Sequence, residues 1–420
     1  MDTLGAAREL IGHTLAFHIV IVALSIGLPI LMSMFEWRAW RHNSARDRAL
    51  VTLLSRWAGV FVIGGVFTGT AVALQMSTLW APFLVEVKPS VGVLFQLEGY
   101  MFLIEAVFLG WYFATMKQVG TLKHLLISLP ISVGTIGSAF FITGVNAYMN
   151  NPSAMFTYTT FLEFTHSVTS YFFATTMVVI GYLAWRSLRK HSNASLVFLQ
   201  HTIGRLGIFA GVLLLVLAFL GHQSAVDIAT SQPHKLAAIE ILDKTQRNAG
   251  LRIGGEINAN GEAEGGIVLP GMLSILVGMN TNTEVKGLDA IPRDRWPMLI
   301  VHTLFDIKMV LVGLSSLIVI ILVWFHWRSK SQPRWFRQAL IPLGAIGFVM
   351  MELGWLITEF GRQSWTVAGK LSTADAMTKG ADIQSTQYVF VTLFAILTVA
   401  SLFALSYTTR HWRKTEKSSW

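Results

Sequence analysis

The chain has 420 residues, of which 53% are hydrophobic and only 13% are charged, and its mean hydropathy is +0.56. This composition excludes an ordinary soluble domain. The absence of cysteine excludes disulfides, iron–sulfur clusters and thiolate ligation of a metal, so any metal must be held by His, Met or carboxylate. The net charge of +9 does not indicate a nucleic-acid partner, because the basic residues stand at the ends of apolar runs.

Apolar runs long enough to cross a hydrocarbon core of about 30 Å, which takes roughly 20 helical residues, recur along nearly the whole chain. The first run follows Arg8 and Glu9 and is too long for the apolar region of a cleavable signal. We therefore predict an all-α polytopic membrane protein. Its nine predicted spans cover residues 14–35, 57–77, 94–116, 122–145, 165–185, 203–222, 299–325, 338–358 and 386–408.

Basic residues gather after the odd-numbered spans, whereas the segment 146–160 after the fourth span has no charged residue. Positive side chains are retained on the cytoplasmic side of a membrane. We therefore expect the N-terminus outside and the C-terminus in the cytoplasm. The basic residues that carry this prediction are Arg38, Arg41, Arg46, Arg48, Arg56, Lys117, Lys123, Arg186, Arg189, Lys190, Arg328, Lys330, Arg334, Arg337, Arg410, Arg413, Lys414 and Lys417.

The predicted spans divide the chain into three parts. Residues 1–222 hold helices one to six, residues 223–298 form an extracytoplasmic loop, and residues 299–420 hold helices seven to nine and a cytoplasmic tail. The loop contains the glycine-rich stretch GGEINANGEAEGG, which we expect to be mobile. A loop of this length in a compact protein is usually functional or disordered.

Ionisable residues inside membrane spans are costly and are therefore functional candidates. His18 lies among apolar neighbours in the first span and is either a hydrogen-bonded core residue or a metal ligand. In the third span, Glu98 and Glu105 are seven residues apart, about two helical turns, and so share one face. They indicate a proton relay or, alternatively, two separate hydrogen bonds to neighbouring helices.

The later spans contain further candidates. His166 opens the fifth span, and in the seventh span His302, Asp306 and Met309 follow one another at helical spacing. Met in an apolar helix is usually core filler, but a His on another helix would make it one half of a His/Met haem ligand pair.

The eighth span carries Glu352 and Glu359, again seven residues apart, with Arg362 one turn beyond. A carboxylate beside a guanidinium near the outer surface is either a plain ion pair or a metal ligand next to a propionate clamp.

Several segments together resemble subunit I of the cytochrome bd-type quinol oxidases, in the order seen in that family and over nearly the whole chain. They are LAFHIVI, LEGYMFLIEAVFLG, VNAYMNNP, FTHSVTSYFF, QPHKLAAIE, LPGMLSIL with VKGLDAIP, and EFGRQSW. The resemblance departs at Ile307, where the family commonly has an Arg two residues before its axial Met, and at Ser364, which replaces a Pro. It indicates a divergent branch with a short quinol loop.

The resemblance implies a role for each candidate. His18 would ligate one high-spin haem, and Glu359 would ligate or adjoin the other. His166 and Met309 would be the axial pair of a low-spin haem b. The other implied positions are Glu98 and Glu105 on the proton path, Asn146 beside them, Arg362 at haem propionates, and Lys235 and Glu240 at the quinol site.

The resemblance also implies the reaction. Quinol is oxidised at the outer face, and O2 is reduced to water with protons taken from the cytoplasm. The cofactors are a low-spin haem b, a high-spin haem b, and either haem d or a further haem b. The expected partners are subunit II, a small single-span subunit, quinol, O2 and lipid, in a bacterial inner membrane.

Three alternatives remain open from the sequence. The chain could be a secondary transporter or ion channel whose intramembrane carboxylates bind a cation, or a haem-binding homologue without quinol oxidation. The segment HKLAAIEILDK also fits an exposed amphipathic loop helix, in which Lys235 and Glu240 would be solvated.

Overall fold

The computed structural model describes residues 3–189, 192–380 and 383–415. Within these ranges, nine helical segments are long and apolar enough to cross a membrane, which confirms the predicted number of spans. Residues 416–420 of the predicted tail and Lys190 lie outside the described residues. The spans are α1 (Thr3–His42), α2 (Ala45–Leu79), α3 (Ala81–Ala114), α4 (Leu122–Asn150), α5 (Tyr158–Ser187), α6 (Asn193–Ser231), α9 (Ile300–Trp327), α10 (Arg334–Ala339) with α11 (Leu343–Arg362), and α13 (Ile383–Thr415).

Side-chain caps define where several of these helices begin. Ser44 accepts a hydrogen bond from the Asp47 amide before α2, and Thr121 accepts one from the His124 amide before α4. The helices extend past the predicted apolar limits because polar residues continue the helix beyond the hydrocarbon. α6 thus ends at Ser231, and the connecting region begins at Gln232 rather than at 223.

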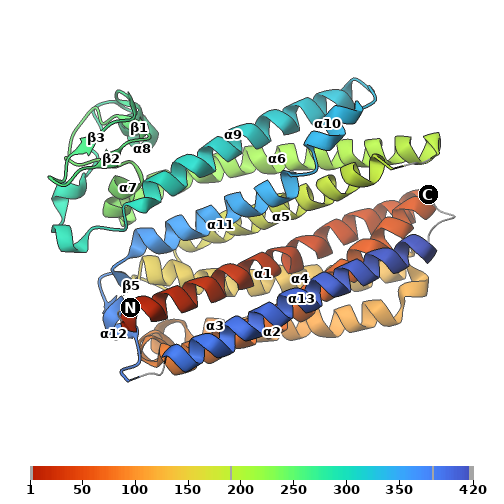
Figure 1. Ribbon diagram of the computed structural model, residues 1–420, viewed down its shortest axis with the longest axis horizontal. Coiled ribbons are helices and arrows are strands. Elements are labelled where there is room, and N and C mark those ends of the chain that lie inside the picture. Colours follow the sequence, from red (N-terminus) through yellow and green to blue (C-terminus); the bar gives the residue numbers. More distant parts are fainter. Residues whose placement is uncertain (1–2, 190–191, 381–382, 416–420) are drawn as a thin grey trace.

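The long helices run side by side along the longest axis of the molecule (Figure 1). One group contains α1, α2, α3, α4 and α13, and the other contains α5, α6, α9 and α11. α1 joins the two groups because it packs against both α4 and α5. The N- and C-terminal ends of the described chain lie at opposite ends of the bundle, as an odd number of spans requires.

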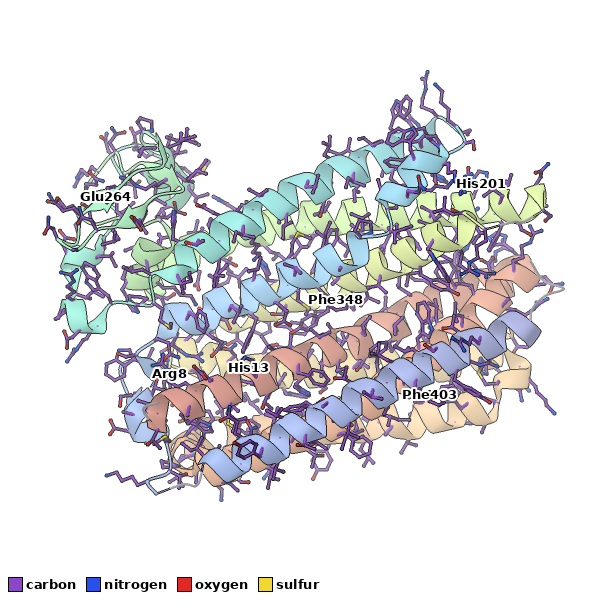
Figure 2. All side chains as sticks on the ribbon, viewed as in Figure 1. Arg8, His13, His201, Glu264, Phe348 and Phe403 are labelled. Atoms are coloured by element: carbon purple, nitrogen blue, oxygen red, sulfur yellow. The ribbon has the colours of Figure 1, made fainter. Side chains whose placement is uncertain are left out.

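The region between α6 and α9, residues 232–299, folds into a small ordered unit, the outer unit, at one end of the bundle (Figure 1). Its own core contains Leu236, Ile239, Leu273 and Leu288. Figure 2 shows Glu264 of this unit and His13 of α1 toward the same end, and His201 of α6 toward the other. The unit consists of α7 (Pro233–Ile239), β1 (Leu251–Ile253), β2 (Glu256–Ile257), β3 (Ala263–Glu264), β4 (Ile267–Leu269), α8 (Met272–Gly278), η2 (Leu288–Ala290) and η3 (Arg293–Arg295).

The glycine-rich stretch that we expected to be a mobile loop contains the antiparallel pair of β2 with β3, and the strands that flank it, β1 and β4, form a second antiparallel pair. Gly254, Gly255, Gly265 and Gly266 all have positive φ there, a conformation that glycine adopts without steric cost. The glycines therefore shape a defined hairpin. The remaining short elements are η1 (Met116–Gln118), β5 (Trp365–Val367), β6 (Leu371–Ser372) and α12 (Thr373–Ala376).

α3 and α4 approach each other closely at Gly134. A Cβ atom at this position would lie 2.8 Å from the Met101 carbonyl oxygen and 2.9 Å from the Glu105 amide nitrogen. Only glycine fits without moving a backbone, so this residue fixes the distance between α4 and the carboxylates of α3.

We predict that Gly134→Ala destabilises the folded chain by about 1–3 kcal/mol, because overpacking forces the two backbones apart. Gly110→Ala is the matched control, since a Cβ atom there meets nothing within 4 Å. The measurement is the fraction of monodisperse detergent-purified protein that survives heating. Equal survival of the two variants would contradict the role of Gly134.

Candidate functional site

His18 on α1 has one ring nitrogen, Nδ1, occupied by a hydrogen-bond partner. Its Nδ1 lies 2.8 Å from the Thr68 hydroxyl of α2, which itself lies 2.9 Å from the Gly64 carbonyl oxygen. The single hydroxyl proton of Thr68 goes to that carbonyl, so the hydroxyl accepts from Nδ1–H of His18. The lone pair of His18 is then on Nε2. This is the arrangement by which proteins orient a metal-ligating imidazole.

The carboxylates of Glu98 and Glu105 lie on the side of α3 that packs against α4. Glu98 accepts a hydrogen bond of 2.9 Å from Ser138, whereas Glu105 is buried and its Oε1 has no hydrogen-bond partner among the described residues. A buried carboxylate oxygen without a partner is costly. Glu105 therefore fits a group that exchanges a proton better than it fits a structural hydrogen bond.

The sequence analysis missed a polar row that continues from these carboxylates toward the opposite end of the bundle. His124, Ser128, Ser132, Thr135 and Ser138 recur every three or four residues along α4 and so share one face. Ser33 of α1 joins the row, with its Oγ 2.9 Å from that of Ser128. The spacing of the small hydroxyl residues in α4 was the signal that could have revealed this row.

At the end of the row, three fully buried side chains of different helices meet. Tyr112 donates a hydrogen bond of 2.8 Å to Glu36, whose other oxygen lies 2.5 Å from His124 Nδ1. None of the three is more than 1% exposed. Glu36 also accepts from the amide of Gly120, at 3.3 Å, which ties the carboxylate to the turn after α3.

A second polar cluster lies at the other end of the bundle, around Arg362. Its Nη1 donates to Asn146, at 2.9 Å, and to Asn150, at 3.2 Å, while its Nη2 donates to Glu359, at 2.5 Å. The amide of Asn150 in turn donates to Glu163 on α5, at 2.8 Å. The structure thus brings together the predicted residues Asn146, Glu359 and Arg362, and it adds Asn150 and Glu163, which the sequence analysis did not single out.

Lys235 on α7 lies against this cluster. Its aliphatic chain contacts Gly361, where a Cβ atom would lie 2.8 Å from Lys235 Cγ, and its ammonium interacts with Glu163 and Glu359. The side chain is only 4% exposed. Burial lowers the pKa of Lys235 to about 8, and the neighbouring Glu163 carboxylate opposes that shift.

Glu240 ends α7 and is only 3% exposed. Burial raises its pKa to about 7, a shift that the backbone amide of Arg252 opposes through a hydrogen bond and that Asp306 reinforces. The alternative of an exposed amphipathic loop helix is therefore wrong. Hydrophobic residues of the outer unit and the tops of α9 and α11 cover α7, so neither charge faces open solvent.

His302 and Asp306 clamp this region to α9. His302 Nδ1 donates to the Ile239 carbonyl, at 2.7 Å, and Nε2 lies 3.3 Å from Asp306. Asp306 accepts a hydrogen bond of 2.6 Å from the Gly254 amide. Both residues therefore hold the outer unit in place, and neither is free to act as a ligand.

His166 on α5 has a buried Nδ1 without a hydrogen-bond partner among the described residues, and its ring interacts with the Leu220 carbonyl of α6. On α9, the predicted partner Met309 is 48% exposed. The side chain that reaches toward α11 instead is that of Lys308, whose Nζ would lie 2.9 Å from a Cβ atom on Gly354.

These residues suit a cofactor that brings most of its own metal ligands. Within the described ranges, no three His, Cys, Asp or Glu side chains converge on one point. Single histidines with a free ring nitrogen, His18 and His166, fit instead the axial position of a macrocycle such as haem. The fold and the site indicate an intramembrane cofactor-binding protein with buried carboxylates.

Comparison with known proteins gives the family. The model of the family described as "Cytochrome bd terminal oxidase subunit I" matches residues 6–413 of this chain. A Bacillus subtilis (strain 168) protein assigned as a cytochrome bd menaquinol oxidase subunit I is 31% identical, over 97% of this chain and 96% of its own. The cytochrome bd ubiquinol oxidase subunit 1 of the same organism is 25% identical, over 90% of this chain and 86% of its own.

A solved structure, that of bd oxidase from Geobacillus thermodenitrificans, has a TM-score of 0.90 at 28% identity and covers 98% of this chain and 99% of its own. The chain belongs to the cytochrome bd terminal oxidase subunit I family. It is the haem-bearing subunit of a bacterial membrane oxidoreductase of the respiratory chain. Nothing supports the transporter or channel alternative.

We predict that Asp306→Ala loosens the outer unit locally. The variant leaves the Gly254 amide without its acceptor, which costs about 1–3 kcal/mol, so hydrogen exchange should accelerate roughly tenfold or more in residues 251–269. Peptide-resolved deuterium exchange is the measurement. Glu284→Ala, at an exposed residue of the same unit, is the control. An unchanged exchange rate in Asp306→Ala would remove this residue from the clamp.

Proposed function

We propose that quinol is oxidised at the α7 end of the bundle and that its electrons enter the haem held by His166. The observation that carries this proposal is the burial of Lys235 on α7 and of Glu240, the residue that caps its C-terminus, where this helix packs against α9 and α11. Two buried charges of opposite sign are costly unless they have a role. The positive-inside pattern supports an extracytoplasmic location for this end.

The chemistry of quinol oxidation suits these two groups. Glu240, with its pKa raised to about 7 by burial, can accept a phenolic proton near neutral pH. Lys235, as an ammonium, can hydrogen-bond the other oxygen and stabilise the anion that forms there. Protons released at this site leave on the outer side.

The remaining predicted residues have consistent roles in this proposal. His18 would hold one high-spin haem through Nε2, and Glu359, already paired with Arg362, would ligate or adjoin a second, which is haem d or a further haem b. His166 would hold a low-spin haem b, with its second axial ligand from α9, where Lys308 and Met309 are the candidates. Haem, when bound, carries the electrons and reduces O2.

The polar row of α4 supports proton delivery from the cytoplasmic end. The row begins at the Glu36–His124–Tyr112 cluster and ends at Ser138, which donates to Glu98, while Glu105 lies against α4 at Gly134. Hydroxyl and carboxyl groups can pass a proton between neighbours, whereas the surrounding apolar side chains cannot. Each proton taken from this end and each proton released at the α7 end moves charge across the membrane without a pump.

The exposed apolar faces support the predicted partners. In the most apolar part of α13 only 6% of the residues are buried inside the protein, and in that of α3 only 17% are. The corresponding share in α5 is 61%. Such faces require lipid or another membrane protein. Subunit II is the general partner of the family, and we propose that it or a small single-span subunit covers part of this surface.

We predict that Glu240→Ala abolishes quinol oxidation, because the phenolic proton then has no acceptor. Dithionite should still reduce every haem of this variant, and the reduced enzyme should still consume O2. Glu262→Ala, at an exposed residue of the same unit, is the matched control and should retain parental activity. A Glu240→Ala enzyme that oxidises quinol at the parental rate would favour a haem-binding homologue without this reaction.

We also predict a bell-shaped pH profile for quinol oxidation. The rate should fall below about pH 7, where Glu240 becomes protonated, and above about pH 8, where Lys235 loses its proton. Initial rates with a soluble quinol across roughly pH 5–10, a range that brackets both groups, provide the measurement. The rate of haem reduction by dithionite should not fall at either end of this pH range. A rate of quinol oxidation that does not change with pH would exclude both groups from the rate-determining step.

A further inference from the structure

One row of α9 faces the interior of the bundle, and Lys308 stands on it. Positions 301, 308, 315 and 322 follow one another at intervals of seven residues, and Lys308 occupies the second of them. The other three, Val301, Ser315 and Leu322, are at most 1% exposed. Residues seven apart on a helix lie on nearly the same face. Met309 is turned about 100° away from that row and is 48% exposed.

The Lys308 ammonium reaches α11 at Gly354. A Cβ atom on Gly354 would lie 2.9 Å from Lys308 Nζ and 3.6 Å from Cε. Glycine therefore leaves room for the end of this side chain between α9 and α11. Among the described residues, Nζ has no hydrogen-bond or ion-pair partner.

The packing of α11 on α5 sets the depth of Gly354. These helices are antiparallel, and Cβ atoms on Gly344 and Gly347 would lie 3.0 Å from Val178 Cα and 3.1 Å from Ala174 Cα. Continuing this register by seven residues along each helix brings Gly354 level with Ser167, the residue next to His166. The Lys308 amine and the His166 imidazole therefore lie at the same depth.

The two side chains also complement each other chemically. They are close enough to interact electrostatically, and His166 Nδ1 lacks a hydrogen-bond partner among the described residues. An unpaired ammonium in an apolar interior is costly. A group that accepts the nitrogen lone pair would remove that cost, and a haem iron between α5 and α9 is such a group.

We propose that the amine of Lys308, rather than the thioether of Met309, is the second axial ligand opposite His166. This inference rests on the proposed function, since it requires haem at His166. Formation of the iron–nitrogen bond requires the neutral amine, so one proton leaves Lys308 to solvent when the bond forms. The oxidation state of the iron does not change in this step.

The identity of the ligand has a consequence for electron transfer. A thioether raises the reduction potential of a haem relative to nitrogen ligands, because the softer sulfur donor stabilises the reduced iron. A His/Lys haem should therefore have a lower midpoint potential than a His/Met haem in the same protein. Electrons would then leave it more readily toward the high-spin haems.

The test is spectroscopy of the oxidase purified from membranes with its accompanying subunits. The parent enzyme should show a low-spin haem without the near-infrared sulfur-to-iron charge-transfer band, and Met309→Leu should have the same spectrum. Lys308→Leu should convert this haem to a high-spin form. Lys308→Met should gain the charge-transfer band and show a higher midpoint potential than the parent.

The inference would be overturned by a sulfur-to-iron band in the parent that disappears in Met309→Leu, or by a low-spin signal that survives in Lys308→Leu. Haem content by pyridine haemochrome and elution as a single species check that each variant is folded. If Lys308→Leu does not fold, the parent, Lys308→Met and Met309→Leu spectra still decide the ligand. His166→Ala should lose the low-spin haem, and its retention there would contradict the proposed function itself.

Discussion

The hydrogen bonds of the Arg362 guanidinium are the interaction on which the α7 end of this molecule depends. It joins α11 to α4 through Asn146 and Asn150, and Asn150 extends the connection to Glu163 on α5. A guanidinium can satisfy several acceptors in one plane, so it can be buried at a junction of three helices. Because Lys235 lies against this junction, the network also fixes α7. The position of the proposed quinol site is thus a consequence of one buried charge and its partners.

The same physical constraint explains the distribution of the other polar groups. In a bundle that faces hydrocarbon, a buried charge persists where it is paired or has a function. Glu36 is paired, with Tyr112 and His124, whereas Glu105 and His166 each have a buried atom without a hydrogen-bond partner in the part of the chain that the structure describes. A paired buried group such as Glu36 anchors helices to one another, whereas a buried group such as Glu105 or His166 is available to a cofactor or a proton. Small hydroxyl residues of α4 lie between the Glu36 cluster and Glu98.

The sequence predicted the nine spans correctly, because apolar length alone determines them. It also predicted that Glu98 and Glu105 share a face, since that depends only on helical geometry. It did not predict the partners of Arg362 or the row on α4, because these depend on which helices are neighbours. The choice between Lys308 and Met309 was beyond the sequence for another reason. The two positions differ by one residue, and only the packing of α9 on α11 shows which of them faces inward. The hairpins of the outer unit were missed because glycine-rich sequence indicates both mobile loops and tight turns.

The central claim is that the interior of this bundle holds haem on His18 and His166. The most direct measurement is the absorbance spectrum of the purified protein, combined with its haem content per chain. The account predicts a Soret band, a low-spin component that His166→Ala removes, and a high-spin component that His18→Ala removes while the low-spin component remains. A monodisperse, folded protein without a Soret band, or one that loses all its haem together in either variant, would contradict it.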